Sequence, residues 1–229
     1  MLFWDFPKQL GIDISNRDPN FFKPQGIIIF TGEQGSGKTM SMIKCATDLK
    51  EQYPKCKVIS NTGFSLQDKE MKSWKDLTSY NNGDKGVVVV WDEIQNAMNS
   101  RSYKNFPMEM VGVVTQNRKN KRIILCTAQS LHMVDKTIRV QMSEERHCIN
   151  LFGVLNFVFR YKYQFDSDGE PIKKSFKGLY FYCQSDKLRN SYDTYKVIDV
   201  LTKSGFNERS ANNDTKIIYN DKKKKSFKW

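Results

Sequence analysis

A complete phosphate-binding motif, G-x-x-x-x-G-K-[ST], occupies residues 32–39: Gly32-Glu33-Gln34-Gly35-Ser36-Gly37-Lys38-Thr39. The residues before it, 26–30, form an apolar run typical of a buried strand, and the apolar residues of 40–52 recur at helical spacing. Glycines let backbone N–H groups turn inward around a phosphate, and the N-terminus of the following helix adds positive potential. This strand–loop–helix context therefore predicts a nucleotide site.

Two side chains of the motif have expected roles of their own. Lys38 would reach the β- and γ-phosphates, and the Thr39 hydroxyl would coordinate Mg²⁺. The predicted cofactors are therefore ATP and Mg²⁺, with all of residues 32–39 in the nucleotide-binding set.

Two adjacent carboxylates at the end of another apolar run predict hydrolysis as well as binding. Residues 87–93 read Val-Val-Val-Val-Trp-Asp-Glu, the pattern of a central parallel strand whose end meets an active site. Asp92 would hold the Mg²⁺ shell, and Glu93 would polarise the water that attacks the γ-phosphate. In the alternative interpretation the two carboxylates only cap the helix that follows. The complete phosphate-binding motif upstream favours the catalytic interpretation.

The composition indicates one α/β domain with a polyanionic partner. A length of 229 residues suits a single domain with an appendage, and the net charge of +12 favours nucleic acid or an anionic membrane surface. Five scattered cysteines, with no pair at metal-ligand spacing, indicate reduced thiols in a cytosolic protein. No apolar run approaches the roughly 20 residues that a membrane-spanning helix needs.

Strands alternate with helices over the first half of the chain, which predicts a parallel sheet with right-handed crossovers. The expected division is an extended leader over residues 1–25, an ATPase domain over 26–205 and a flexible basic tail over 206–229. Within the domain the expected strands are 26–30, 57–61, 87–91 and 122–127, the expected helices are 40–52 and 108–117, and 66–85 is irregular or weakly helical.

A β-hairpin is predicted over residues 156–182. Residues 156–165 and 173–182 alternate apolar with polar residues, and 166–170 have the composition of a turn. Aromatic residues would line one face and basic residues much of the other, a combination that suits nucleic-acid phosphates and bases. In the simpler alternative the aromatic face packs on the domain and the lysines stay in water, because strands routinely alternate in this way.

The two ends of the chain add further candidate contacts. The aromatic residues 1–6 could dock on the domain itself, which is the simplest interpretation, on a neighbour or on lipid headgroups. Residues 222–229 read Lys-Lys-Lys-Lys-Ser-Phe-Lys-Trp, and such a run on a flexible arm attracts the phosphates of DNA and of lipid alike. The tail therefore does not distinguish the two partners.

Gln129 ends a strand that should lie beside the strand of Asp92, where its amide can hydrogen-bond the attacking water or sense the γ-phosphate. Arg118 stands eleven residues before it. With other short motifs, this spacing resembles the FtsK/HerA superfamily of DNA-pumping ATPases, and within it the zonula-occludens-toxin-like phage assembly ATPases and the genome-packaging ATPases of tailless phages. The motifs are Asp92-Glu93-Ile94-Gln95, Ser100-Arg101, Asn117-Arg118, Thr127-Ala128-Gln129-Ser130, Val134-Asp135-Lys136, Ile138-Arg139 and Ser191-Tyr192-Asp193-Thr194.

The resemblance implies a P-loop NTPase fold of the additional-strand, catalytic-Glu class. Its parallel central sheet is flanked by helices, and a strand lies between the phosphate-loop strand and the Asp92 strand. It also implies a homo-oligomeric ring in which an arginine of one subunit reaches the γ-phosphate held by its neighbour. Arg118 is the first candidate for that arginine and Arg139 the second, followed by Arg101 and Arg122.

The implied function is ATP hydrolysis coupled to sequence-independent DNA translocation, most simply in packaging a phage genome. Assembly proteins of filamentous phages usually carry a membrane span, and none is found here, which favours packaging over membrane extrusion. The expected location is the host cytoplasm, peripheral at a virion vertex or membrane. The alternative is a membrane-associated ATPase of virion assembly or extrusion. The docking partner would be a capsid vertex or a membrane protein. A nucleotide switch or kinase is disfavoured by Glu93 and by the lack of an arginine-rich lid.

Overall fold

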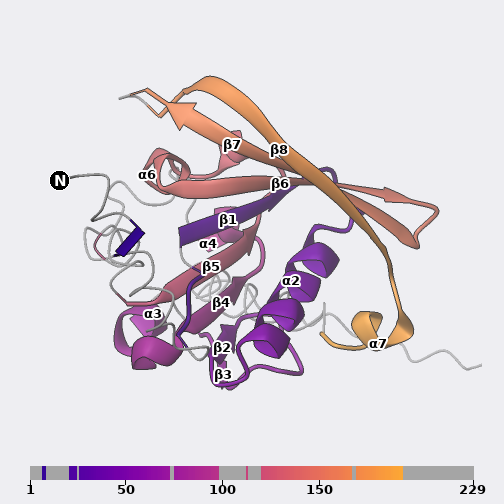
Figure 1. The fold of residues 1–229 in the computed structure, drawn as a ribbon. Coiled ribbons are helices and arrows are strands. Elements are labelled where there is room, and N and C mark those ends of the chain that lie inside the picture. The colour runs from indigo at the N-terminus through magenta and orange to yellow at the C-terminus, as the bar shows by residue number, and fades with distance from the viewer. Residues whose placement is uncertain are drawn as a thin grey trace, which may run out of the picture.

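The computed structural model describes residues 7–8, 21–24, 26–72, 75–97, 112, 120–166 and 169–192. They build one eight-stranded sheet of order β3-β2-β4-β5-β1-β6-β7-β8, shown in Figure 1. The strands are β1 Gly26–Thr31, β2 Lys57–Ser60, β3 Lys69–Glu70, β4 Val87–Trp91, β5 Arg122–Thr127, β6 Met142–Leu151, β7 Leu155–Phe165 and β8 Pro171–Cys183.

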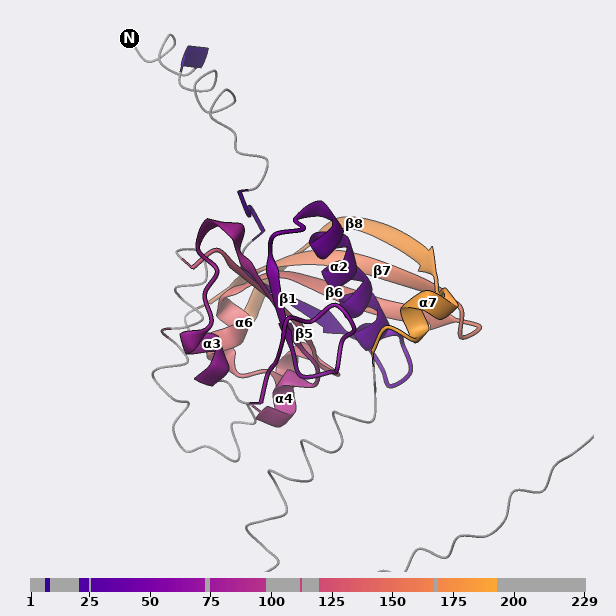
Figure 2. The same ribbon diagram turned by 90° about the horizontal axis from the view of Figure 1, so that it is seen from below.

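Helix α2 is the longest helix among the described residues, and α7 lies beside it (Figure 2). Met40, Ile43 and Ala46 are buried on α2 at three-residue spacing, so the helical periodicity of the sequence marks the face that packs on the sheet. The helices are α2 Lys38–Gln52, α3 Lys75–Ser79, α4 Ile94–Ala97, α6 Lys136–Val140 and α7 Asp186–Arg189, with 3-10 turns at Gly83–Lys85 and Leu131–Met133.

The first six strands in sheet order, β3, β2, β4, β5, β1 and β6, run parallel. Strand β5 lies between β1 and β4. The strand between the phosphate-loop strand and the Asp92 strand is therefore present, as expected. Because the carboxyl ends of parallel strands share one edge, the loop after β1, the carboxylates after β4 and Gln129 after β5 meet there. The expected helix over 108–117 lies outside the described residues, apart from Gly112.

Strand β6 was not expected from the sequence. It reads Met-Ser-Glu-Glu-Arg-His-Cys-Ile-Asn-Leu, pairs parallel with β1 and antiparallel with β7, and so joins the predicted hairpin to the main sheet. The region 66–85, expected to be irregular or weakly helical, contains the two-residue β3, α3 and a 3-10 turn.

The hairpin of β7 and β8 is confirmed, but the expectation of a single aromatic face is wrong for β8. Pairing of the two strands shifts near Lys177, which forms a β-bulge. Successive residues of a strand point to opposite faces, so this shift turns Tyr180 and Tyr182 toward the core on the α2 side. Phe176 and Phe181 lie on the other face and are largely exposed.

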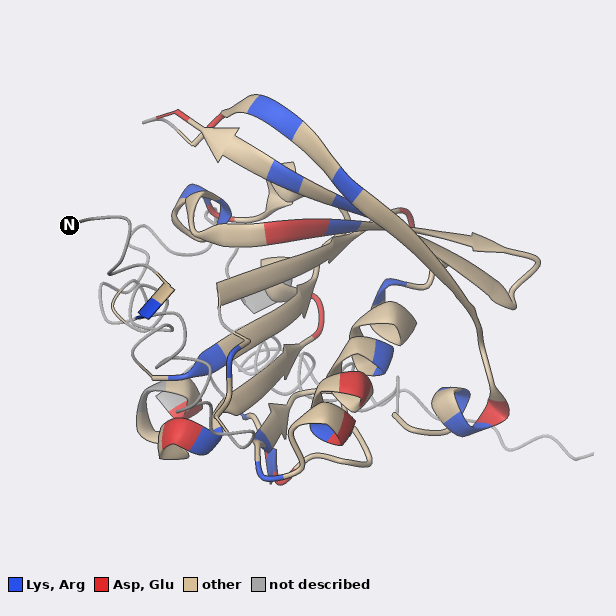
Figure 3. Cartoon of the chain, viewed as in Figure 1, with Lys and Arg blue, Asp and Glu red and all other residues tan. Residues whose placement is uncertain are grey.

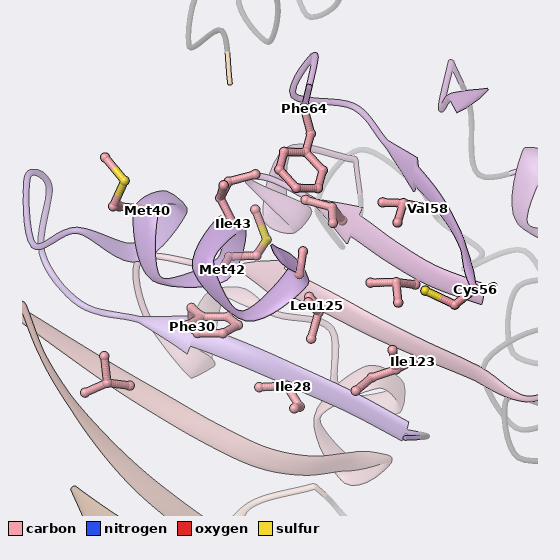
Figure 4. Packing of buried hydrophobic residues seen from close by; sticks show 14 of the residues in the cluster. Ile28, Phe30, Met40, Met42, Ile43, Cys56, Val58, Phe64, Ile123 and Leu125 are labelled. Atoms are coloured by element: carbon pink, nitrogen blue, oxygen red, sulfur yellow. The ribbon is translucent and has the colours of Figure 1, made fainter. Parts of the chain in front are cut away.

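The core has two layers, one on each face of the sheet. Phe30, Leu125 and Val58 point from the strands toward Ile43 of α2, as Figure 4 shows. On the opposite face the side chains of Ile29, Val89 and Ile124 belong to a second buried cluster, which includes Ile138 of α6. Both layers are continuous with the edge where the phosphate-binding loop lies.

Part of the expected leader packs into this core. Phe22 is 1% exposed, its ring lies edge-on to Tyr53 at a centroid distance of 5.1 Å, and a Cβ on Gly86 would overlap it. The Phe22 backbone N–H donates to the Asp84 carbonyl oxygen at 3.0 Å. Residues 21–24 therefore contribute to the domain.

Phe22→Ala is expected to lower the free energy of unfolding by about 3–5 kcal/mol, because a buried aromatic side chain leaves a cavity. Urea denaturation followed by circular dichroism would measure the change. Phe152→Ala is the matched control, since Phe152 is 96% exposed, and its effect should stay within about 0.5 kcal/mol. Equal stability of the two variants would show that Phe22 does not belong to the core.

Candidate nucleotide site

The phosphate-binding loop needs glycine at two positions for space as well as for conformation. Gly37, which precedes α2, has a φ of 82°, and Gly32 has a φ of 142°. A Cβ on Gly37 would overlap the Asn156 side-chain amide, and a Cβ on Gly32 would overlap the Ser36 side chain and the Cys148 carbonyl oxygen. Cys148 and Asn156 belong to β6 and β7. The shape of the loop therefore depends on the sheet extension as well as on the motif.

Lys38 and Thr39 lie where the sequence places them. Lys38 is 7% exposed, and its Nζ donates to the Glu33 carbonyl oxygen at 2.8 Å across the loop. An ammonium group has three donors, so others can bind phosphate oxygens. The Thr39 hydroxyl donates to Asp92 Oδ1 at 3.0 Å. The two groups predicted to share Mg²⁺ are therefore adjacent.

Asp92 is held by hydrogen bonds from the ends of two other strands, β5 and β2, besides the bond from Thr39. Thr127 Oγ1 donates to its Oδ1 at 2.6 Å, and the Asn61 amide exchanges two hydrogen bonds of 2.8 and 3.1 Å with its backbone. Burial raises the pKa of Asp92, against the opposing effects of the bonds from Thr127 and Thr39 and of the Lys38 charge. A buried carboxylate with a raised pKa gains stabilisation when a cation arrives.

The site fits an ATP–Mg²⁺ complex. Mg²⁺ in phosphate-transfer sites takes one or two protein oxygens, the rest of its ligands being phosphate oxygens and waters. Thr39 and Asp92 can supply the protein oxygens, and Lys38 with the loop N–H groups can bind the phosphates. The adjoining cavity measures about 630 Å³, within the usual range for small-molecule sites of about 300–1,000 Å³.

Glu93 lies next to Asp92 but is aimed differently by its backbone. Its φ of 54° is left-handed, which is strained for a residue with a Cβ, and its N–H donates to Thr127 Oγ1 at 2.8 Å. Gln95 Nε2 donates to its Oε2. Burial, and then the charge of Asp92, raise the pKa of Glu93. A carboxylate with a raised pKa that lines the cavity has the properties of a general base.

Gln129 directly follows Ala128 at the carboxyl end of β5. Its side chain is exposed and lines the nucleotide cavity, and its carbonyl oxygen accepts from the Gly32 N–H at 3.4 Å. Gln129 also lines a second cavity of about 290 Å³ on the other side of the β1 end. Its position suits the predicted contact with water or phosphate, and that role stays a prediction.

The candidate arginines lie in different places. Arg118 and Arg101 fall outside the described residues. Arg139 of α6 is 8% exposed, lines the second cavity, and its Nη2 lies 3.6 Å from Oε1 of Glu170 in the hairpin turn. This burial within its own subunit does not favour a role at a neighbour's nucleotide. Arg122 is buried at the start of β5, at the opposite edge from the loop, which removes it from the candidates.

Several residues of the site were given no role by the sequence. Thr127 and Asn61 position Asp92, and the only sequence signal was a polar residue at each strand end. The far wall of the cavity comes from the end of β6, the β6–β7 turn and residues after β8. These wall residues are Asn150, Gly153, Gln184 and Tyr192.

The sequence profile of the "ATPase family associated with various cellular activities (AAA)" matches residues 28–149, which include Asp92, Glu93 and Gln129. The chain belongs to this AAA family. Membership supports nucleotide binding, typically with Mg²⁺, and ATP hydrolysis at the site. A search of curated proteins finds no similar sequence.

The fold of this AAA protein is similar to that of the N-terminal domain of zonular occludens toxin from Neisseria meningitidis. The TM-score is 0.52 at 19% identity, covering 73% of this chain and 98% of the other. The genome packaging NTPase B204 from Sulfolobus turreted icosahedral virus 2, in complex with AMPPCP, gives a TM-score of 0.44 at 15% identity, over 56% of this chain and 78% of the other. The predicted P-loop α/β fold is confirmed.

Asp92→Asn is expected to raise the Tm of the nucleotide-free protein at pH 7. Burial raises the folded-state pKa of Asp92, so ionisation costs folding free energy above that pKa and costs nothing below the unfolded pKa of about 3.9. The neutral amide removes this cost, and Tm changes by roughly 2–4 °C per kcal/mol in a domain of this size.

Differential scanning fluorimetry at pH 7 and at lower pH would show a gain in Tm that shrinks with acidification. Glu51→Gln is the control, because Glu51 is exposed at the end of α2. A lower Tm for Asp92→Asn than for the wild type at pH 7 would contradict the account of Asp92.

Proposed function

We propose that this ATPase is a DNA translocase that works as a homo-oligomeric ring and packages a phage genome. The observation that carries the proposal is the continuity between the ATP site and a basic surface. Strands β7 and β8 carry Arg160, Lys162, Lys173, Lys174 and Lys177 and no carboxylate, visible as blue bands in Figure 3. The turn that begins β7 also lines the nucleotide cavity.

The ATP site would use its residues in four ways. Glu93 accepts the proton of the attacking water, Gln129 orients that water, and Lys38 neutralises charge that develops on the phosphates. Bound Mg²⁺, held by Thr39 and Asp92, supplies charge neutralisation. An arginine from the neighbouring subunit completes the site, and Arg118 is its first candidate.

DNA contact would be electrostatic and blind to sequence. Lysine and arginine side chains neutralise phosphates and release counterions, which makes binding strongly dependent on salt but not on base sequence. A motor that moves along a whole genome needs that property. The working site would be the host cytoplasm, at a capsid vertex or at a membrane protein that anchors the ring.

The second candidate function is virion assembly or extrusion at a membrane. An exposed apolar turn favours it: Phe152 is 96% exposed, Val154 44% and Leu151 42%, and such a turn could enter a lipid headgroup layer. Among the described residues no helix has the length and apolarity to cross a bilayer.

Steady-state ATP hydrolysis by the purified chain, with and without DNA and at two salt concentrations, separates the two candidates. A translocase is stimulated by DNA, and the stimulation fades as salt rises because the contacts are to phosphates. Flotation with anionic vesicles is measured in parallel. If DNA does not stimulate hydrolysis and the protein binds to vesicles, the translocase is excluded and the membrane-linked ATPase is the supported function.

A further inference from the structure

The sheet extension carries an exposed apolar surface on the face turned away from α2. The four most exposed of its side chains are Phe181 (67%), Phe176 (60%), Leu179 (47%) and Ile149 (40%). They come from β6 and β8, and three aromatic residues of β7, which lies between those strands, are on the same face. We call this surface the aromatic platform; it consists of Ile149, Phe157, Phe159, Tyr161, Phe176, Leu179 and Phe181.

The strand register makes the platform continuous. Ile149, Phe157 and Phe181 are paired in one row across the three strands, and the rings of Phe157 and Phe181 are 5.8 Å apart. Further along the strands Tyr161 is paired with Phe176, again with ring centroids 5.8 Å apart. Neighbouring strands in a sheet lie about 4.8 Å apart, so these rows form one contiguous surface rather than scattered exposed residues.

The charge around the platform selects the kind of partner. Five cations and no carboxylate lie on β7 and β8. The carboxylates of β6 are Glu145 and Glu144, and Glu144 is paired with Arg146 and Arg160, so cations remain in excess over the three strands. Lys174 is on the platform face itself, with its Nζ 3.8 Å from the Tyr161 ring centroid and 3.6 Å from the buried Glu145. Electrostatic attraction extends about 8 Å at physiological salt, so cations on both faces of one sheet contribute. The surface is complementary to a polyanion.

We propose that the aromatic platform binds single-stranded DNA, with unpaired bases stacked on Phe157, Phe176 and Phe181 and phosphates near the lysines. This inference rests on the proposed function and specifies its substrate. Stacking of aromatic side chains on unpaired bases contributes binding free energy. In a duplex the bases are already stacked on one another, so a protein can contact only the phosphates and the groove edges. A second copy of the same platform would bring like charges together, which disfavours self-association through this face.

The platform also has a direct connection to the ATP site. Ile149 belongs to the platform and lines a cavity of about 380 Å³ together with Glu33, Gln34 and Gly35 of the phosphate-binding loop. The next residue, Asn150, lines the nucleotide cavity and donates to Asn156, whose side chain packs on Gly37. Along β6 the platform is therefore one residue away from the nucleotide site.

Fluorescence anisotropy with a labelled oligothymidylate of about 20 nucleotides tests the inference, with a duplex of equal length as the comparison. The full chain is used. Loss of two stacking rings in Phe176→Ala/Phe181→Ala is expected to weaken single-strand binding at least about 10-fold, with a smaller effect on the duplex. Phe181→Trp should keep or strengthen binding, because a larger ring stacks as well. Phe152→Ala, an exposed phenylalanine outside the platform, should bind like the wild type.

Two results would overturn the inference. One is unchanged single-strand affinity in the double variant, whose native far-ultraviolet circular dichroism is checked first. The other is loss of binding to anionic vesicles in that variant with DNA affinity intact, which would assign the platform to lipid. Failure of the inference leaves the proposed function open if duplex DNA still stimulates ATP hydrolysis. Conversely, single-stranded DNA could bind the platform without stimulating ATP hydrolysis. That result would rule out the translocase and support the platform as a binding surface.

Discussion

Glu93→Gln is expected to lower kcat for ATP hydrolysis by about 10²- to 10⁴-fold, the range typical of a lost general base. The amide has nearly the same shape as the carboxylate but cannot accept a proton from the attacking water. Lys38, Thr39 and Asp92 are untouched by the change, so the Kd for Mg·ATP should stay within about threefold, since the interaction is one made only in the transition state.

A coupled phosphate-release assay and fluorescent-nucleotide binding measure the two quantities separately. Glu51→Gln makes the same chemical change on the exposed end of α2 and should leave both unaffected. If Glu93→Gln hydrolyses ATP at the wild-type rate, another group activates the water.

The acid limb of the pH profile follows from the same carboxylate. Burial and the charge of Asp92 raise the pKa of Glu93 above its ordinary value of 4.5. A general base works only when deprotonated, so kcat/KM should fall as the pH drops through that raised pKa. The fall should begin at a higher pH than for an ordinary glutamate and should vanish in Glu93→Gln.

Lys38→Ala is expected to weaken ATP binding by about 100-fold or more and to remove measurable hydrolysis. Each charge-assisted hydrogen bond to a phosphate contributes about 1.5–3 kcal/mol, and the ammonium can make more than one. The loss acts on the ground state and on the transition state, because charge on the phosphates grows during the reaction.

The matched control for this change is Lys44→Ala. Lys44 lies on the same helix, with its side chain 33% exposed and paired with Asp48 at 2.8 Å. Isothermal titration calorimetry with Mg·ATP should give similar affinities for Lys44→Ala and the wild type. Tight ATP binding by Lys38→Ala would mean that the nucleotide binds elsewhere.

The central strands could be predicted because their sequences carry one dominant signal. β1, β4 and β5 are buried on both faces and read as continuous apolar runs. β6 lacks that signal because it carries charged residues among its apolar ones. Neighbouring side chains compensate these charges: Glu144 accepts from Arg146 at 2.7 Å and from Arg160 of β7 at 2.6 Å. Burial of paired charges depends on the assembled sheet, so no local pattern reveals it.

The candidate site could likewise be predicted only in part. The phosphate-binding motif and the two carboxylates can be recognised in the sequence, and the ends of neighbouring parallel strands must meet at one edge of the sheet. The Asn156 contact with Gly37 and the bond from Thr127 to Asp92 arise between segments far apart in the chain. The bulge at Lys177 likewise decided which aromatic side chains are exposed, because a shift of one residue exchanges the two faces.

Displacement of streptavidin from the biotinylated end of a DNA oligonucleotide measures ATP-driven movement along DNA itself. Single-stranded and duplex substrates are used with the wild type and with Glu93→Gln. Displacement is expected to require ATP, to be lost in Glu93→Gln and to be stronger on the single strand. Continued ATP hydrolysis with no displacement from either substrate would contradict the proposed translocation.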